Sequence, residues 1–271
     1  MEPLTALVLI VIAVLISASL FDIMYRELPD AHWMIIGTAG IVCLGISDHS
    51  PSGLLMAAGS VLFLIDIRTE GMAHIMLLMT ATASFKTAAV IGCDDMSRCV
   101  STPLCVLLSH LLYQSGVLKG GADAKCIISL SIALPVYPEG FSIVRIPPGT
   151  GEAILSAFPL SVLLMASILT VSSAIPLMVW NMLYDSGRDV HDILLVRMGI
   201  DDARRSHVWP RQDIIDGEIV RVKEADEGAL DRLEYIGVEK VLVSPMIPFI
   251  VPITVATIFE IIVMYPIVLI S

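Results

Sequence analysis

The stretch LTALVLIVIAVLISASLF, residues Leu4–Phe21, has no charged side chain and is followed directly by Asp22. Because about 20 apolar residues in a helix cross the hydrocarbon of a bilayer, the stretch predicts a membrane-spanning helix that ends in an aspartate. A carboxylate near the hydrocarbon costs roughly 2.5–3.5 kcal/mol on insertion scales, which makes Asp22 a candidate functional residue. A second aspartate of this kind, Asp123, lies in GGADAK at residues 120–125, between two further apolar runs.

The composition of the whole chain is that of a membrane protein. Hydrophobic residues make up 56% of the 271 residues, charged residues 16%, and the mean hydropathy is +0.85. Soluble domains average about 45–50% apolar and about 25% charged residues, so we interpret the chain as an integral membrane protein. The formal net charge of −11 argues against a nucleic-acid partner, because nucleic acids are themselves anionic.

Apolar segments recur along the chain and predict an all-α polytopic membrane protein with about six to eight transmembrane helices. The eight segments lie near residues 4–24, 32–47, 52–67, 72–91, 100–118, 122–138, 152–184 and 245–270. The third to sixth are short for hydrocarbon about 30 Å thick, which leaves the number of spans open. We expect a transmembrane domain at 1–184 and a C-terminal transmembrane helix within 245–271.

The segment 185–244, between the last two apolar segments, is polar and predicts a small cytosolic α+β insertion. Its beginning shows the helical spacing of four apolar residues, Val190, Ile193, Leu194 and Met198. Its later part alternates as short strands do, at 217–223 and at 233–243. We therefore expect a separate water-soluble module.

The basic residues set the expected orientation, because cytosolic ends of spans carry more lysine and arginine. With the N-terminus outside, the inner ends hold four basic residues and the outer ends two: Arg26, Arg68, Lys119 and Lys125 against Arg98 and Arg145. Only Glu2 is charged before the first run, which is not typical of a cleaved signal peptide. We expect a multi-pass cell-membrane protein with Asp22, Asp123 and the module on the cytosolic side.

Two aspartates at the same depth of one membrane face are suited to aspartyl chemistry. Two carboxyl groups in one cavity do not readily ionise together, so Asp22 and Asp123 are expected to hold one proton between them. The ionised member activates water for attack on a peptide carbonyl, and the protonated member donates to the carbonyl oxygen. Gly120 and Gly121 permit positive φ and the close approach of another backbone, such as an extended substrate.

These motifs resemble those of a known family. The stretch Gly120–Asp123 is similar to the signature of the GxGD-type membrane aspartyl proteases, although Ala122 stands where the signature has its second glycine. Phe21-Asp22, followed by ELPD at residues 27–30, resembles the region of their first aspartate. An aspartate in the first span with such an element after it is typical of type IV prepilin peptidases, and the archaeal preflagellin and prepilin peptidases are the most similar group.

The resemblance implies the roles of the residues and the kind of substrate. Asp22 and Asp123 become the catalytic pair, and the substrate is contacted by Gly120, Gly121, Ala122 and Lys125. The family cleaves short basic leader peptides from type IV pilin-like or archaellin precursors on the cytosolic side of the bilayer. Bacterial members often carry C-x-x-C pairs and methylate the new N-terminus. The five cysteines here form no such pair, so we expect no structural zinc, no cofactor and no methyltransferase activity.

Several other polar residues are interpreted as structural. His74 and His110 are expected to be hydrogen-bond partners within the bundle rather than metal ligands, because no H-E-x-x-H element or third ligand accompanies them. Asp66, Arg68 and Glu70 are expected to form a solvated turn at the inner face.

Two charged residues each keep two interpretations. Lys125 either pairs with Asp123 or extends to phosphate headgroups, and the headgroups are favoured because residues two apart in a helix point away from each other. Glu260 lies within the last apolar segment. It either helps to position the aspartates or makes an interhelical hydrogen bond.

Other classes of protein remain alternatives. Membrane carboxylates also serve as proton relays and ion sites in proton- or ion-coupled transporters, although no internal repeat is evident in this chain. Intramembrane proteases of the presenilin or signal-peptide-peptidase type carry a Pro-Ala-Leu element, which this sequence lacks. A non-enzymatic membrane anchor for the polar module would leave the two aspartates unexplained.

Overall fold

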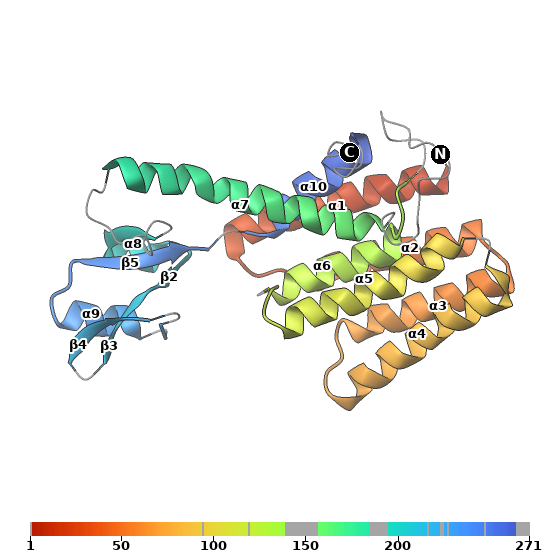
Figure 1. Cartoon of the computed structure of the whole chain (residues 1–271), viewed down its shortest axis with the longest axis horizontal. Helices are drawn as coiled ribbons and strands as arrows, with labels where there is room; N and C mark the ends of the chain where they lie inside the picture. Colours follow the sequence, from red (N-terminus) through yellow and green to blue (C-terminus); the bar gives the residue numbers. More distant parts are fainter. Residues whose placement is uncertain are drawn as a thin grey trace. The chain divides into compact units, whose positions relative to one another are not determined.

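The computed structural model describes most of the chain and divides it into two compact units (Figure 1). The described residues are 2–93, 95–118, 120–138, 157–184, 195–215, 217–222, 225–226, 228–246 and 248–263. One unit comprises Met1–Ser167 with Phe249–Ser271 and is called the helical unit. The other, Ile168–Pro248, is called the mixed unit because it contains strands and short helices.

Each of the eight predicted apolar segments contains one helix. These helices are α1 (Pro3–Tyr25), α2 (Ala31–Ser47), α3 (Pro51–Asp66), α4 (Met72–Gly92), α5 (Met96–Gln114), α6 (Gly121–Ala133), α7 (Phe158–Tyr184) and α10 (Ile250–Ile262). By length and composition, α1, α4 and the Phe158–Pro176 part of α7 are able to cross a membrane, and α2, α3 and α10 are shorter apolar helices. The architecture is that of a helical membrane protein.

Helices α2 to α6 lie side by side within the helical unit (Figure 1). Local sequence sets their ends: at the start of α3, Ser50 accepts a hydrogen bond from the Gly53 N–H at 3.0 Å, and Pro51 occupies the first helical position. Helix α2 approaches α6 closely at Gly40, where a Cβ atom would lie 2.5 Å from the Ala133 Cα. Glycine at this position therefore allows the two backbones to touch.

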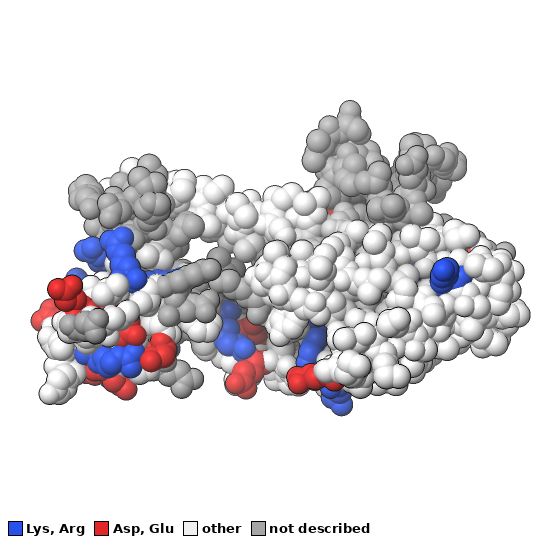
Figure 2. Space-filling view, turned by 60° about the horizontal axis from the view of Figure 1, so that its bottom comes forward, with Lys and Arg blue, Asp and Glu red and all other residues white. Residues whose placement is uncertain are grey.

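The surface of the helical unit is apolar in the way expected for contact with lipid. Large hydrophobic side chains stand exposed along α4, for example Met72 at 77% and Val90 at 79%. On the face seen in Figure 2, charged side chains gather over the mixed unit and are sparse over the helical unit. Extended apolar surfaces of this kind are rare on soluble monomers, so their presence agrees with a membrane location.

In its described residues, the mixed unit contains the C-terminal part of α7, two antiparallel sheets and two short helices. The elements are β1 (Val196–Gly199), α8 (Ile200–Arg205), β2 (Val208–Pro210), β3 (Gln212–Ile215), β4 (Glu218–Arg221), α9 (Ala229–Tyr235) and β5 (Lys240–Pro245). Strand β5 lies between β1 and β2, while β3 and β4 form a hairpin whose turn contains Gly217 at φ 83°. Leu233 from α9 packs with Val241 and Val243 from β5 in the core.

The predicted elements of the polar segment are only partly confirmed. Strand β4 lies within the predicted 217–223, and β5 accounts for the end of the predicted 233–243. Leu233 is helical, and Met198, which was assigned to a helix, lies in β1. The other residues of that predicted helix, at 190–194, lie outside the described residues.

A bidentate ion pair fastens α9 to β3 in the mixed unit. Arg232 donates from Nε to Asp213 Oδ1 at 3.0 Å and from Nη2 to Asp213 Oδ2 at 2.7 Å, and it also binds Asp226. The hydrogen bonds from Arg232 hold the pKa of Asp213 below its ordinary value. A similar arrangement binds Arg204 of α8 to Asp231 and Glu234 of α9.

Candidate active site

Asp22 lies in the last turn of α1, where it is half-buried and faces the start of α10. Its carboxyl group accepts a hydrogen bond from the backbone N–H of Ile250, the first residue of α10. The first N–H groups of a helix have no intrahelical acceptor and favour a negative charge. Ser19 and Thr254, whose hydroxyl oxygens are 2.7 Å apart, join the same two helices. A helix from the far end of the sequence therefore positions Asp22.

Asp123 is the third residue of α6, and Gly120 is the N-cap residue of that helix. The Asp123 carboxyl folds back to accept a hydrogen bond from the Gly120 N–H, as an acidic residue does at this position of a capping box. It also lies close enough to Asp22 for the two carboxyl charges to interact. The structure thus brings the two aspartates together at one end of the helical unit.

The two glycines before Asp123 have different surroundings. Neither has a positive φ, and Gly120 has φ −89° and ψ 122°, so the positive φ that glycine permits is not adopted at either position. A Cβ atom at Gly120 would lie 2.4 Å from Asp123 Oδ2. At Gly121 it would make only an ordinary contact, 3.6 Å from the Tyr113 hydroxyl. Gly120 therefore makes room for the Asp123 carboxylate. Ala122, the next residue of α6, is half-buried.

Lys125 is bound within the protein and does not extend to headgroups as the sequence favoured. Its Nζ donates to Asp30 Oδ1 at 2.7 Å, and the other oxygen of Asp30 lies 3.7 Å from Arg68 Nε. Asp30 precedes the first residue of α2. The ion pair therefore ties the turn after α1 to the helix that carries Asp123, and Lys125 acts on the site through that turn.

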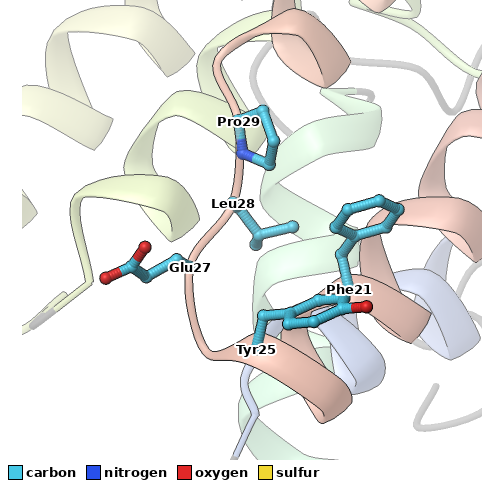
Figure 3. Close-up of a pocket in the computed structure, with 5 residues that line it drawn as sticks. All are labelled: Phe21, Tyr25, Glu27, Leu28 and Pro29. Atoms are coloured by element: carbon cyan, nitrogen blue, oxygen red, sulfur yellow. The ribbon is translucent and has the colours of Figure 1, made fainter.

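A pocket of about 410 Å³ lies at the end of α1 and along the turn that follows it. It is lined by Phe21, Tyr25, Glu27, Leu28 and Pro29. Figure 3 shows the Leu28 side chain directed toward the two aromatic rings, with Glu27 on the opposite side of the backbone. The rings of Phe21 and Tyr25 are 5.5 Å apart between centroids. The pocket is therefore an apolar surface with one acidic group at its edge.

Four of these residues, Phe21, Glu27, Leu28 and Pro29, belong to the motif around the first aspartate, but none was predicted to form a binding site, and Tyr25 was not singled out. The available signals were the aromatic residues at Phe21 and Tyr25, one helical turn apart, and the ELPD element. His32 supports the pocket from α2: Nδ1 lies 3.2 Å from the Pro29 carbonyl oxygen and Nε2 3.3 Å from the Ser17 hydroxyl. A neutral ring protonated at Nδ1 satisfies both hydrogen bonds.

Of the two interpretations of Glu260, the structure agrees with an interhelical hydrogen bond. Its carboxyl oxygens accept from the Tyr137 hydroxyl at 2.7 Å and from the Ser161 hydroxyl of α7 at 2.9 Å. Ten residues of helix separate it from Ile250, which places it about 15 Å along α10 from the end that contacts Asp22. Glu260 therefore joins helices and does not position the aspartates directly.

The prediction of a solvated turn at residues 66–70 is wrong for one of the three charged residues. Arg68 and Glu70 are exposed, but Asp66 is buried at the end of α3. His74 and His110 both contact its carboxylate. His74 is hydrogen-bonded to Asp66 as expected, whereas His110 Nε2 lies 3.0 Å from the carboxylate without a hydrogen bond. Asp66 is a third polar residue that the sequence did not associate with the two histidines.

No protein-family model matches this chain, and a comparison with curated proteins finds no relative. The functional assignment therefore depends on the site itself. That site combines two neighbouring carboxyl groups, each fixed by a backbone N–H, and an apolar pocket lies at the end of the helix that carries one of them. Such a combination is suited to acid–base activation of water beside a bound chain.

Proposed function

We propose that the protein is a membrane aspartyl endopeptidase that removes short basic leader peptides from type IV pilin-like or archaellin precursors. The proximity of the Asp22 and Asp123 carboxyl groups carries the proposal, because α1 and α6 bring them to the same end of the helical unit. The similarity of GGAD and of the ELPD region to the GxGD-type prepilin peptidases supports the same activity.

The two aspartates divide the chemistry between them. Neighbouring carboxyl groups share one proton, and the ionised member accepts a proton from water as that water attacks the scissile carbonyl. The protonated member donates to the carbonyl oxygen, and the proton transfers then reverse to release the amine. The N–H groups of Ile250 and Gly120 hold the carboxyl groups in fixed orientations, which reduces the reorganisation needed in the transition state.

The pocket at the end of α1 supports the choice of substrate. Phe21, Tyr25 and Leu28 offer an apolar surface to the hydrophobic segment that follows a leader peptide. Glu27 adds a carboxylate at the same pocket, which attracts the basic residues of the leader. A precursor lying along this surface would run past the end of α1, the helix that carries Asp22.

Six to eight of the helices are proposed to span the bilayer, with the N-terminus outside and the mixed unit in the cytosol. Successive helices run antiparallel in a chain of short connections, so the ends of α1, α3 and α5 fall at one face. Arg26 and Arg68 follow α1 and α3, and Lys125 lies near the start of α6, the helix after α5, in agreement with the excess of lysine and arginine at cytosolic ends. Cleavage then takes place at the cytosolic face.

The test is processing of a pilin precursor in a host that lacks other prepilin peptidases. We expect Asp22→Asn and Asp123→Asn each to lower the cleavage rate at least about 10²-fold, because each removes an acid–base group. Glu70→Gln is the matched control, since Glu70 is an exposed acid in the turn after α3. Cleavage by either aspartate variant at the rate of the control would refute the proposal.

A further inference from the structure

A second group of polar side chains lies where α3, α4 and α5 meet. Asp66 is the last residue of α3, His74 the third residue of α4, and His110 lies in the last two turns of α5. The distance from Asp66 Oδ1 to His74 Nδ1 is 2.6 Å, and Asp66 Oδ2 is 3.0 Å from His110 Nε2. One ligand atom from each residue lies within 4.8 Å of the others. None of these helices supplies Asp22 or Asp123.

The cluster is buried, so the charge of its carboxylate needs a compensating partner. The Asp66 side chain has 0% exposure, and those of His74 and His110 are 17% and 15% exposed. Among the described residues, the two histidines are the only ion-pair partners of Asp66. A buried carboxylate is costly unless it is paired with a cation or a metal.

Two atoms of the cluster lack a hydrogen-bond partner. Asp66 Oδ2 and His110 Nε2 are buried and lie 3.0 Å apart, yet they are not aligned for a hydrogen bond with each other. Buried polar atoms are nearly always satisfied, so an exception needs an explanation. A positively charged ion that accepts a lone pair from each of the two atoms would satisfy both.

We propose that Asp66, His74 and His110 bind a divalent transition-metal ion of the Zn²⁺ class. Two imidazoles and one carboxylate are a common protein ligand set for such ions, and three protein ligands leave a further coordination position for water or a bound group. The metal also supplies the positive charge that the buried carboxylate needs. The site goes beyond the proposed protease activity and does not depend on it.

The distances in the cluster are compatible with this ligand set. Bonds of about 2.0–2.2 Å in a tetrahedral site separate neighbouring ligand atoms by about 3.3 Å. Asp66 Oδ2 and His110 Nε2, at 3.0 Å, are already near that spacing. Asp66 Oδ1 and His74 Nδ1, at 2.6 Å, separate by a small rotation of the imidazole. The ring centroids of the two histidines are 4.7 Å apart.

The site also has a path to the protein surface. His74 lines a pocket of about 450 Å³ whose other walls come from α4 and α5, including Ile75, Leu78, Leu107 and Gln114. An ion therefore reaches His74 first and passes to the buried Asp66. The competing explanation is a metal-free cluster in which a protonated imidazole balances the carboxylate, and the two explanations differ in metal uptake.

The first experiment measures Zn²⁺ binding to the full chain in detergent micelles after treatment with a chelator. Calorimetry and elemental analysis should give one Zn²⁺ per chain. Asp66→Asn and His110→Gln should each weaken binding at least about 100-fold, since even partners outside the ligand shell are worth 10–100-fold. His49→Gln, at an exposed histidine between α2 and α3, should bind as the wild type does. Absence of uptake by the wild type, or unchanged uptake by both cluster variants, would overturn the proposal.

A second experiment leaves the Asp66 cluster unchanged and separates the site from thiols. Cys93 and Cys99 are free, and their sulfur atoms approach Met56 Sδ at 3.9 and 3.4 Å, so they offer other metal ligands. A protein with both cysteines changed to serine should keep its Zn²⁺. In the wild type, Zn²⁺ should protect His74 and His110, but not His49, from diethylpyrocarbonate. Loss of Zn²⁺ from the serine protein, or equal modification of all three histidines, would contradict the assignment.

Discussion

The carboxylate of Asp123 occupies the space that a side chain at position 120 would fill. An added Cβ atom would lie 2.4 Å from Asp123 Oδ2, which is the end of a rotatable side chain. Helix α6 therefore tolerates the change by moving the carboxylate, and no backbone has to shift. A Cβ atom at position 120 would therefore change the orientation of the proposed catalytic carboxylate much more than the stability of the fold.

We therefore predict that Gly120→Ala lowers precursor cleavage at least about 10-fold while the protein folds normally, because an ångström-scale misplacement of a reacting group is costly. Gly121→Ala is the matched control, since its Cβ would make only an ordinary contact with Tyr113. Cleavage rates and thermal unfolding of both variants, purified side by side, provide the measurement. Equal cleavage by the two proteins would show that the room at Gly120 has no catalytic importance.

The sequence pointed to Asp22 and Asp123 for a general physical reason. A carboxylate next to an apolar run is costly, so its presence indicates a use. Their fixed partners were not predictable in the same way. The Gly120 N–H that binds Asp123 is only three residues away, but the Ile250 N–H that binds Asp22 is distant in the chain, and so is the Asp30 carboxylate that binds Lys125. Such contacts depend on helix packing, and no local pattern specifies it.

At the scale of elements, long apolar segments were easier to predict than short strands. Each apolar segment contains a helix because a run of this length satisfies its backbone internally whatever its neighbours do. Strand β1 has only four residues, and its hydrogen bonds all go to β5, far along the chain. Met198 was therefore assigned to a helix from its spacing, while pairing with Val241 keeps it in a strand.

The ion pair between β3 and α9 gives the mixed unit a defined dependence on pH. Arg232 holds the pKa of Asp213 below its ordinary value, so the folded state favours the ionised carboxylate. The stabilisation is present above the unfolded value of about pH 3.9 and is lost as the pH falls through the lower folded value. Both side chains are partly exposed, so the effect is modest and screened by salt.

We predict that Asp213→Asn increases amide hydrogen exchange in β3 and α9 a few-fold at neutral pH. The difference from the wild type should shrink as the pH falls below about 4 and disappear below the lowered pKa of Asp213, where the wild-type carboxylate is also neutral. Hydrogen-exchange mass spectrometry of the full chain provides the measurement, and Asp201→Asn, an exposed acid on α8, is the control. A difference that persists unchanged in acid would exclude ionisation of Asp213 as its cause.

At the scale of the whole molecule, the Asp66 cluster shows what a single sequence does not reveal. Its three residues come from three helices and follow no short motif, so the sequence presented two separate histidines and a charged turn. The packing of α3 against α4 and of α4 against α5 brings them together. The burial of Asp66 follows from this packing and not from the polar residues around it in the chain.

If six to eight helices span the bilayer, some of the shorter helices must cross it as well. Helix α3 has 16 residues and is about 24 Å long, against hydrocarbon about 30 Å thick. A short span is accommodated by local thinning of the bilayer, at a cost of a fraction of a kcal/mol per ångström. Packing against α2 and α4 offsets such a cost. We therefore expect α3 to cross the membrane although it is shorter than a typical span.

Labelling of single cysteines tests this crossing directly. In a cysteine-free protein that still cleaves its precursor, His49→Cys lies before α3 and Glu70→Cys after it, both at exposed positions. A maleimide that does not cross membranes should label position 49 in intact cells and position 70 only after permeabilisation. Ser115→Cys, after α5, should behave as position 70 does, because α4 and α5 return the chain to the same face. Labelling of positions 49 and 70 from one side would mean that α3 does not cross, and the antiparallel order of the remaining helices would then no longer place Asp22 and Asp123 at a common membrane face.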